Sequence, residues 1–194
     1  DINYAKTLGY KIKLLSISEL IDNKLMERVH PCLVLKNSYI SKIDGVLNAV
    51  VVDGLPIGKS VLQGEGAGPG PTTSALISDL CSILKGEINY PFGISSNSRK
   101  SISNYDISNH VCSSYLRIEV RDLPCVLSSI TKNFAKNKIS IKNLIQRPNK
   151  KNKKASIIII THENLEKNYK NLLISLIKNK FVIKKPTLIR IENV

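Results

Sequence analysis

The chain has 194 residues, 42% of them hydrophobic, which is enough for two domains of roughly 100 residues, each with its own core. No apolar run approaches the roughly 20 residues of a membrane-spanning helix, and the polar start DINYAKTLGYK has no signal-peptide core, so we expect a cytoplasmic protein without a membrane partner. Four cysteines and three histidines are scattered without a CxxC pair, which argues against a metal site or disulfide framework and predicts free thiols.

The formal net charge of +14 is concentrated in the second half of the chain. Residues 86–194 carry 20 basic and 7 acidic side chains, whereas residues 1–85 carry 9 and 8. An anion-binding face is one interpretation, and a compositional drift of the whole proteome toward Lys, Ile and Asn is the other. Only 5% of residues are aromatic, and they do not cluster into a stacking surface, so we expect no nucleic-acid partner.

The first expected elements are a helix end and two strands. Residues 1–9 have helical spacing with Gly9 as the stop signal. Alternation of apolar and polar residues predicts a strand over 10–17. A second strand over 24–35 is expected to be broken at Pro31, which cannot donate a hydrogen bond to a ladder.

A hairpin and a helix are expected next. The apolar run VLNAVVV at 46–52 predicts a buried strand, the turn signal GLP follows at 54–56, and IGKSVLQ at 57–63 predicts the returning strand. A helix then begins, with a cap at Thr72, Thr73 or Ser74 and one apolar face. That face holds Leu76, Leu80, Ile83 and Leu84.

Between the hairpin and this helix lies the glycine-rich stretch GEGAGPG at 64–70. A dinucleotide fingerprint needs GxGxxG, but Pro69 and Pro71 stand where the third glycine belongs, so the fingerprint is excluded. A glycine loop before a helix N-terminus can still contact an anion. A plain structural turn and an anion contact both stay open from spacing alone.

Residues 89–110 are rich in Ser and Asn and are the predicted linker between domains 1–88 and 111–194. The second domain shows six patterned segments in the order strand, helix, strand, strand, helix, strand, with a polar loop NKKNKK between the middle strands. This βαββαβ order is the ferredoxin-like arrangement, so the fold class is α+β. One sheet face is left uncovered, which predicts a homodimer or higher homo-oligomer.

Seven blocks of the sequence resemble a known family. LGYKIKLL, RVHPCLV, GVLNAVVV and QGEGAGPGPTTSALISDL resemble, in this order, the later part of homoserine dehydrogenase. YLRIEVRDLPCVLSSI, SIKNLIQ and IIIITH resemble the regulatory ACT domain that many of these enzymes carry at the C-terminus. The resemblance implies a mixed α/β catalytic-domain segment for substrate binding and dimerisation over 1–88, and a ferredoxin-like βαββαβ ACT domain over 111–194.

By this resemblance the full-length protein is an NAD(P)-dependent oxidoreductase with NAD or NADP as cofactor. It interconverts L-homoserine and L-aspartate 4-semialdehyde in threonine and methionine biosynthesis. The family's Rossmann domain and catalytic lysine lie upstream of Asp1, so no residue of this chain is assigned a catalytic role. The start at Asp rather than Met agrees with a segment of a longer protein.

Two site predictions follow from the resemblance. The glycine block matches a family loop near the nicotinamide side of the cleft, where small residues approach the cofactor or substrate. Its members are Gly64, Gly66, Ala67 and Gly68. Asn48 and Ala49 match the family's NA pair, for which we expect a buried amide that braces the strands.

The second predicted site is an effector turn, Asp122-Leu123-Pro124-Cys125-Val126, where ACT domains have Asp-x-Pro-Gly-Val. The resemblance implies an amino acid effector, threonine first, bound between two copies with help from Ser140 and Ile141. If Cys125 must adopt a positive φ, it adds about 1 kcal/mol of strain. A degenerate ACT domain that only dimerises, and a non-catalytic ACT-type regulatory protein, are the alternatives.

Overall fold

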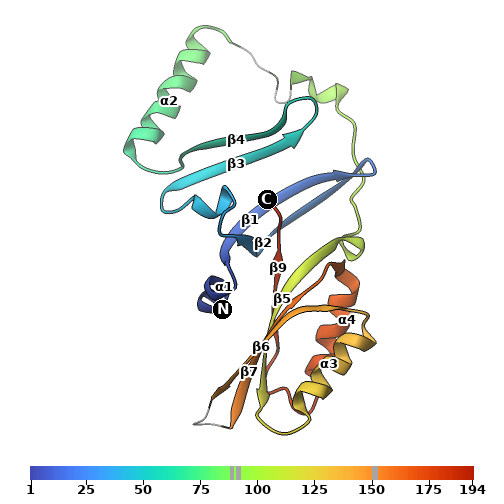
Figure 1. The fold of residues 1–194 in the computed structure, drawn as a ribbon. Helices are drawn as coiled ribbons and strands as arrows, with labels where there is room; N and C mark the ends of the chain where they lie inside the picture. Colours follow the sequence, from blue (N-terminus) through green and yellow to red (C-terminus); the bar gives the residue numbers. More distant parts are fainter. Residues whose placement is uncertain (88–89, 91–92, 150–152) are drawn as a thin grey trace. The chain divides into compact units, whose positions relative to one another are not determined.

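The computed structural model describes residues 1–87, 90, 93–149 and 153–194. It divides into two compact units, which we describe separately. Unit 1 combines Asp1–Ser38 with Ser103–Val194, and unit 2 is Tyr39–Ile102. Figure 1 follows the chain through both units by colour.

Unit 1 contains one mixed sheet with strand order β1-β2-β9-β5-β7-β6, and β8 pairs with β5 beside this path. Every pairing is antiparallel except that of β2 with β9, which is parallel. The elements of this unit are α1 (Ile2–Thr7), β1 (Tyr10–Ile21), β2 (Lys24–Leu35), η4 (Ile107–Asn109), β5 (Val111–Arg121), α3 (Val126–Lys136), β6 (Ile141–Asn149), β7 (Lys154–Thr161), β8 (Asn164–Leu165), α4 (Glu166–Ile177) and β9 (Thr187–Ile191).

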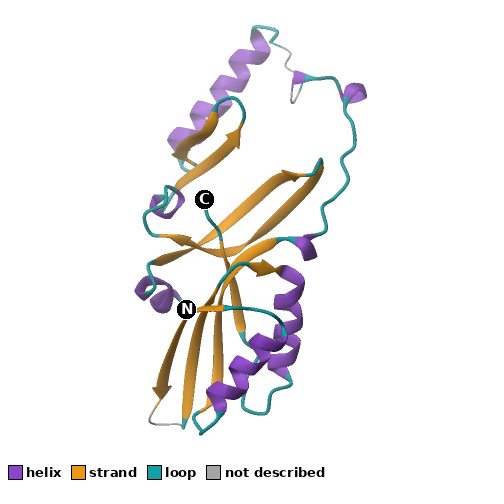
Figure 2. Ribbon diagram, turned by 45° about the vertical axis from the view of Figure 1, so that its right-hand side comes forward, coloured by secondary structure: helices purple, strands orange, loops and turns teal. Residues whose placement is uncertain are grey.

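The C-terminal half of unit 1 has the predicted order of elements, interrupted only by the two-residue β8. Helices α3 and α4 cover one face of the sheet, as Figure 2 shows. Ile130 and Phe134 from α3 and Leu172 from α4 are buried there against the strands. The order of the elements is confirmed, while their assignment to the ACT type stays a prediction.

The opposite face of the sheet holds a second core, which the sequence analysis did not expect. Strand β7 buries Ile157 and Ile159 under the helices and Ile158 and Ile160 on the other side, which explains its continuous apolar run. Helix α1 packs on this second face through Ala5. The expectation of an uncovered face was therefore wrong for this region, because the chain's own first helix covers it. The homodimer stays a prediction, but an uncovered sheet face no longer supports it in this region.

The N-terminal strands form a long hairpin, with Asp22 and Asn23 in the two-residue turn at φ 49° and 58°. The helix predicted over residues 1–9 is confirmed by α1, and Gly9 has φ 84°. The predicted break at Pro31 was wrong, since β2 continues through it opposite Leu14. A missing N–H is tolerated there because β2 pairs with β9 only at the two residues after Pro31, which leaves one side of the strand without a partner.

Unit 2 is a hairpin followed by a helix. It contains η1 (Ile40–Lys42), β3 (Leu47–Gly54), β4 (Gly58–Glu65), α2 (Pro69–Leu84) and η3 (Ser96–Ser98). The hairpin is confirmed, but the expectation that its first strand is buried was wrong: Val50 is 59% exposed and Val52 is 49% exposed. The two strands form a sheet of their own, and no other described strand joins it.

Helix α2 starts earlier than expected. Its N-cap is Gly68, which makes no side-chain capping bond, so the predicted cap at Thr72, Thr73 or Ser74 was wrong. Pro69 is suited to the first helical position because its φ is already helical and its missing N–H would have no partner there. None of the residues of α2 is buried within the described chain, and the four leucines and isoleucines of its expected apolar face are all exposed.

The compact units cut across the domain boundaries expected from the sequence, 1–88, 89–110 and 111–194. Residues 1–38 belong with the C-terminal half because β2 and β9 share a sheet. The boundary at 88 and the middle of the polar loop NKKNKK lie outside the described residues. The assignment of two domains joined by a linker stays a prediction. Among the described helices, none is long and apolar enough to cross a bilayer.

Candidate functional site

The glycine loop joins the end of β4 to the start of α2. Gly66 donates its N–H to the carbonyl of Val46 at 2.9 Å, which ties the loop back to the start of the hairpin. A Cβ on Gly66 would lie 1.4 Å from Asn48 Nδ2, so a larger residue there requires the Asn48 side chain to move. Gly68 has φ 121°, which favours glycine, whereas a Cβ on Gly64 would meet open space.

Asn48 does not brace the strands as a buried amide. It lies on β3 opposite Gly64, and its side chain is exposed. The amide instead stands directly over the backbone of Gly66. The expectation of burial was therefore wrong, and Asn48 forms part of the exposed surface of the glycine loop.

The helix start beside this loop is a weak phosphate site. Free N–H groups of the first turn are what bind an anion at a helix N-terminus. In α2 two of the first three residues, Pro69 and Pro71, have no N–H, which leaves Gly70 alone between them. The loop offers close backbone approach rather than a phosphate cradle.

The predicted effector turn connects β5 to α3. Asp122 donates its N–H to the carbonyl of Lys153 at 2.9 Å, and the carbonyl of Cys125 accepts the N–H of Ser129 at 3.0 Å. Cys125 has φ 67° and ψ −1°, which is the left-handed conformation that glycine adopts without cost. Its side chain is exposed. The turn therefore keeps the backbone form of a glycine-containing turn, with a cysteine in the strained position.

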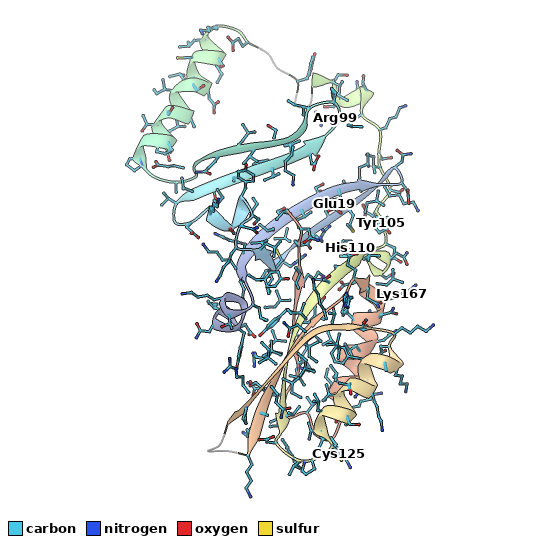
Figure 3. The ribbon with its side chains drawn as sticks, in the orientation of Figure 1. Glu19, Arg99, Tyr105, His110, Cys125 and Lys167 are labelled. Carbon is cyan, nitrogen blue, oxygen red and sulfur yellow. The ribbon has the colours of Figure 1, made fainter. Side chains whose placement is uncertain are left out.

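Within one chain the two parts of the predicted effector site are far apart. Arg121, just before the turn, pairs with Lys154 at the start of β7, whereas Ile141 pairs with Thr161 at its end. Seven residue steps along a strand span about 23 Å. Figure 3 labels Cys125 at one end of this part of unit 1 and His110 near the other. A site that includes Ser140 requires a second copy of the chain.

A cavity of about 700 Å³ lies between α4, the turn that contains η4, and the segment that leads into β9. It lies entirely within unit 1. Its lining is Asp106, Ile107, Ser108, Glu166, Tyr169, Lys170, Leu173, Lys185, Pro186, Thr187, Leu188 and Arg190. No local motif in the sequence marks it, because its walls come from three segments that only the fold brings together.

The ion pair of Arg190 with Glu166 stands in this cavity wall. Arg190 Nε donates to Glu166 Oε2 at 3.0 Å, and Arg190 Nη2 makes a second, shorter contact with Glu166 Oε1. These bonds raise the pKa of Arg190 against the opposing effect of its burial. Behind them, burial first and the nearby Glu166 second raise the pKa of the Cys112 thiol to about 12.

A second charged cluster joins the N-terminal hairpin to the C-terminal end of the chain. Arg28 on β2 contacts Glu192 through Nε at 3.2 Å and Nη2 at 3.0 Å, and Nη2 also contacts Glu19 at 3.1 Å. The Arg28 side chain is 3% exposed. Burial lowers its pKa, but the bonds to the two carboxylates outweigh that effect and raise it. Burial and the charge of Arg28 together lower the pKa of His110.

Residues 1–81 match the homoserine dehydrogenase family model. The whole chain is similar to a curated homoserine dehydrogenase of Helicobacter pylori, at 35% identity over 193 residues, and to one of Neisseria gonorrhoeae, at 32% over 199 residues. It covers 45% and 46% of these relatives, so the chain spans about half the length of the curated proteins it matches.

Solved structures of homoserine dehydrogenases show the same arrangement. The enzyme from Thiobacillus denitrificans is 32% identical with a TM-score of 0.84, and the match covers all of this chain and 45% of that one. A structure from S. aureus, 24% identical with a TM-score of 0.61, supports the fold alone. The homoserine dehydrogenase family match includes the glycine loop and most of α2, whereas the predicted effector turn and the cavity lie beyond it.

Proposed function

We propose that this chain is the C-terminal part of a cytoplasmic NAD(P)-dependent homoserine dehydrogenase, which interconverts L-homoserine and L-aspartate 4-semialdehyde in threonine and methionine biosynthesis. The observation that carries the proposal is the similarity of the entire chain to curated homoserine dehydrogenases at up to 35% identity. In this proposal the domain that binds most of the cofactor and the catalytic lysine belong to the remaining half of the protein.

The contribution of this chain to catalysis is the glycine loop. NAD or NADP would carry the hydride when bound. The small residues of the loop would let the cofactor or the substrate approach the backbone. Two prolines remove N–H groups from the helix start, so the loop is not expected to hold the pyrophosphate. Gly66 makes room for the Asn48 amide, which is the polar group beside the loop.

The test compares two glycine variants in the full-length protein. Gly66→Ala inserts a Cβ where Asn48 Nδ2 now lies, so the amide must move. We expect homoserine oxidation to fall by about tenfold or more, with Asn48→Ala giving a similar loss. Gly64→Ala is the matched control, since a Cβ there meets no atom within 4 Å. Absence of homoserine oxidation with both NAD and NADP in the unmodified full-length protein would overturn the proposal.

A regulatory role for the C-terminal half is the second part of the proposal. The left-handed conformation of Cys125 favours it, because glycine adopts that conformation without cost and Asp-x-Pro-Gly-Val has a glycine at this position. Threonine would bind there between two copies of a homodimer, with its carboxylate at the start of α3 and its ammonium at Asp122.

Calorimetric titration of threonine into the wild-type full-length protein, Cys125→Gly and Asp122→Asn tests this role. Threonine should bind the wild type or Cys125→Gly and should bind Asp122→Asn at least tenfold more weakly. Equal binding to Asp122→Asn and its parent would place the ligand elsewhere, and binding to none of the three would leave the C-terminal half as a dimerisation module.

A further inference from the structure

The cavity of unit 1 has an apolar wall and a charged wall. Leu173 on α4 and Leu188 on β9 form part of its apolar surface, together with Ile107 and Pro186. The charged side chains Lys170 and Lys185 reach it from different segments. A volume of about 700 Å³ is within the range of small-molecule sites, and an apolar wall with a few convergent polar groups is their usual composition.

Hydrogen bonds fix the walls of the cavity. The Tyr169 hydroxyl lies 2.6 Å from Thr161 Oγ1 and donates to the carbonyl of Cys112 or His162, each at 3.0 Å, which anchors α4 to the sheet. The turn before η4 is closed by Asp106, whose carboxylate accepts the N–H of Ser108 at 2.9 Å and its hydroxyl at 2.6 Å. These bonds hold α4 and the turn in place around the cavity.

The turn and α4 are also joined to each other directly. The N–H of Glu166, the first residue of α4, donates to the carbonyl of His110 at 2.8 Å. The opposite wall is held through Glu166 again, by its ion pair with Arg190 on β9. All three segments that surround the cavity are thus connected around Glu166.

The charges in the cavity are unbalanced toward positive. Arg190 is neutralised by Glu166, whereas Asp106 accepts two hydrogen bonds from the neutral Ser108 and keeps its negative charge. Lys170 and Lys185 have no ion pair with any residue that the structure describes. Two cations of this kind, from α4 and from the segment before β9, outnumber the one remaining carboxylate, Asp106, and favour a ligand that carries a carboxylate group.

We propose that this cavity binds a small aliphatic amino acid. The two lysines match its carboxylate, the leucine-lined wall matches its side chain, and the free lone pairs of the Asp106 carboxylate match its ammonium group. The site lies beside the start of β5, because His110 directly precedes that strand, whereas the predicted effector turn follows the end of β5. It is a second site, separate from Asp122.

The ligand class rests on the charges and surfaces of the cavity, and only its meaning as an effector rests on the proposed function. Binding and catalysis can therefore fail independently. An amino acid that binds to a protein without homoserine oxidation would support the site and overturn the proposed enzyme. Homoserine oxidation without amino acid binding at the cavity would support the proposed enzyme and overturn the cavity site.

The experiment is calorimetric titration of valine, threonine and methionine into the full-length protein. We expect at least one to bind, and removal of both cations in Lys170→Gln/Lys185→Gln to weaken that binding about tenfold or more. The matched control is Lys136→Gln/Lys178→Gln, which removes two exposed lysines at the C-terminal ends of α3 and α4 that do not line the cavity. Asp122→Asn should bind like the wild type at this site.

Ligand analogues separate the two charges. For valine, isobutylamine lacks the carboxylate and should not bind, whereas isovalerate lacks the ammonium group and should bind more weakly than valine but still depend on the two lysines. The proposal is overturned if none of the amino acids binds, if the control pair weakens binding as much as the cavity pair, or if Asp122→Asn alone abolishes binding.

Discussion

Replacement of Cys125 by glycine should stabilise unit 1. The left-handed conformation costs an L-residue about 1–2 kcal/mol, and glycine removes this cost. Glycine also makes the unfolded chain more flexible, which lowers the stability of the folded protein by roughly 0.5–1 kcal/mol. The difference is a gain of about 0–1.5 kcal/mol, with a midpoint of roughly 0.75 kcal/mol. No packing is lost, because the cysteine side chain is exposed.

Thermal unfolding followed by far-UV circular dichroism measures this effect. For a protein of this size, 1 kcal/mol corresponds to a shift in Tm of about 2–4 °C, so Cys125→Gly should unfold about 1–4 °C higher than the wild type. The control is Cys125→Ala, which removes the thiol but keeps the Cβ and therefore keeps the backbone strain. A Cys125→Gly protein no more stable than Cys125→Ala would refute the assignment of strain to this position.

Three further predictions concern unit 1. Limited proteolysis should cut the exposed segment 94–102. The two fragments should still elute together in size-exclusion chromatography, because residues 1–38 and 103–194 share a sheet. Separate elution of the fragments would contradict that sheet. Burial and the Arg28 charge lower the pKa of His110 from 6.5, so its neutral form contributes stability that is complete above pH 6.5 and is lost as the pH falls. In His110→Gln the urea midpoint of unfolding should therefore depend less on pH between pH 7 and 5. The same pH dependence in the variant and the wild type would disprove this. Cys125 should react with a thiol reagent at pH 8, whereas Cys32 and Cys112, whose pKa values burial raises to about 12, should react only on unfolding; mass spectrometry of labelled peptides decides.

The elements of the fold were largely predictable from local patterns, whereas their partners were not. Alternation identified β1 and β5, and helical spacing identified α3 and α4, because these signals depend on neighbours in sequence. The parallel pairing of β2 with β9 joins residues such as Cys32 and Arg190, for which no local pattern exists. This pairing is why the compact units differ from the expected domains.

The site predictions divide in the same way. The glycine loop is visible in the sequence because its small residues stand together before a helix, whereas the turn at Cys125 was predicted from its resemblance to an ACT turn. The prediction that Asn48 is buried was wrong, since an exposed amide over Gly66 and a buried one look alike in sequence. The cavity was missed because Lys170 and Lys185, which are distant in sequence, line the same cavity only in the folded chain.

The parallel contact between β2 and β9 also determines when unit 1 can be completed during synthesis. β2 pairs with β1 at once, but its other neighbour, β9, follows more than 150 residues later in the chain, since Cys32 pairs with Arg190. Until then β2 has no strand beside Cys32 and Leu33 on the side away from β1, and Arg28 has no Glu192. Contacts so distant in sequence form slowly. The nascent hairpin therefore exposes an unpaired strand edge during synthesis, and β9 covers that edge at Cys32 and Leu33 only when the chain is nearly finished.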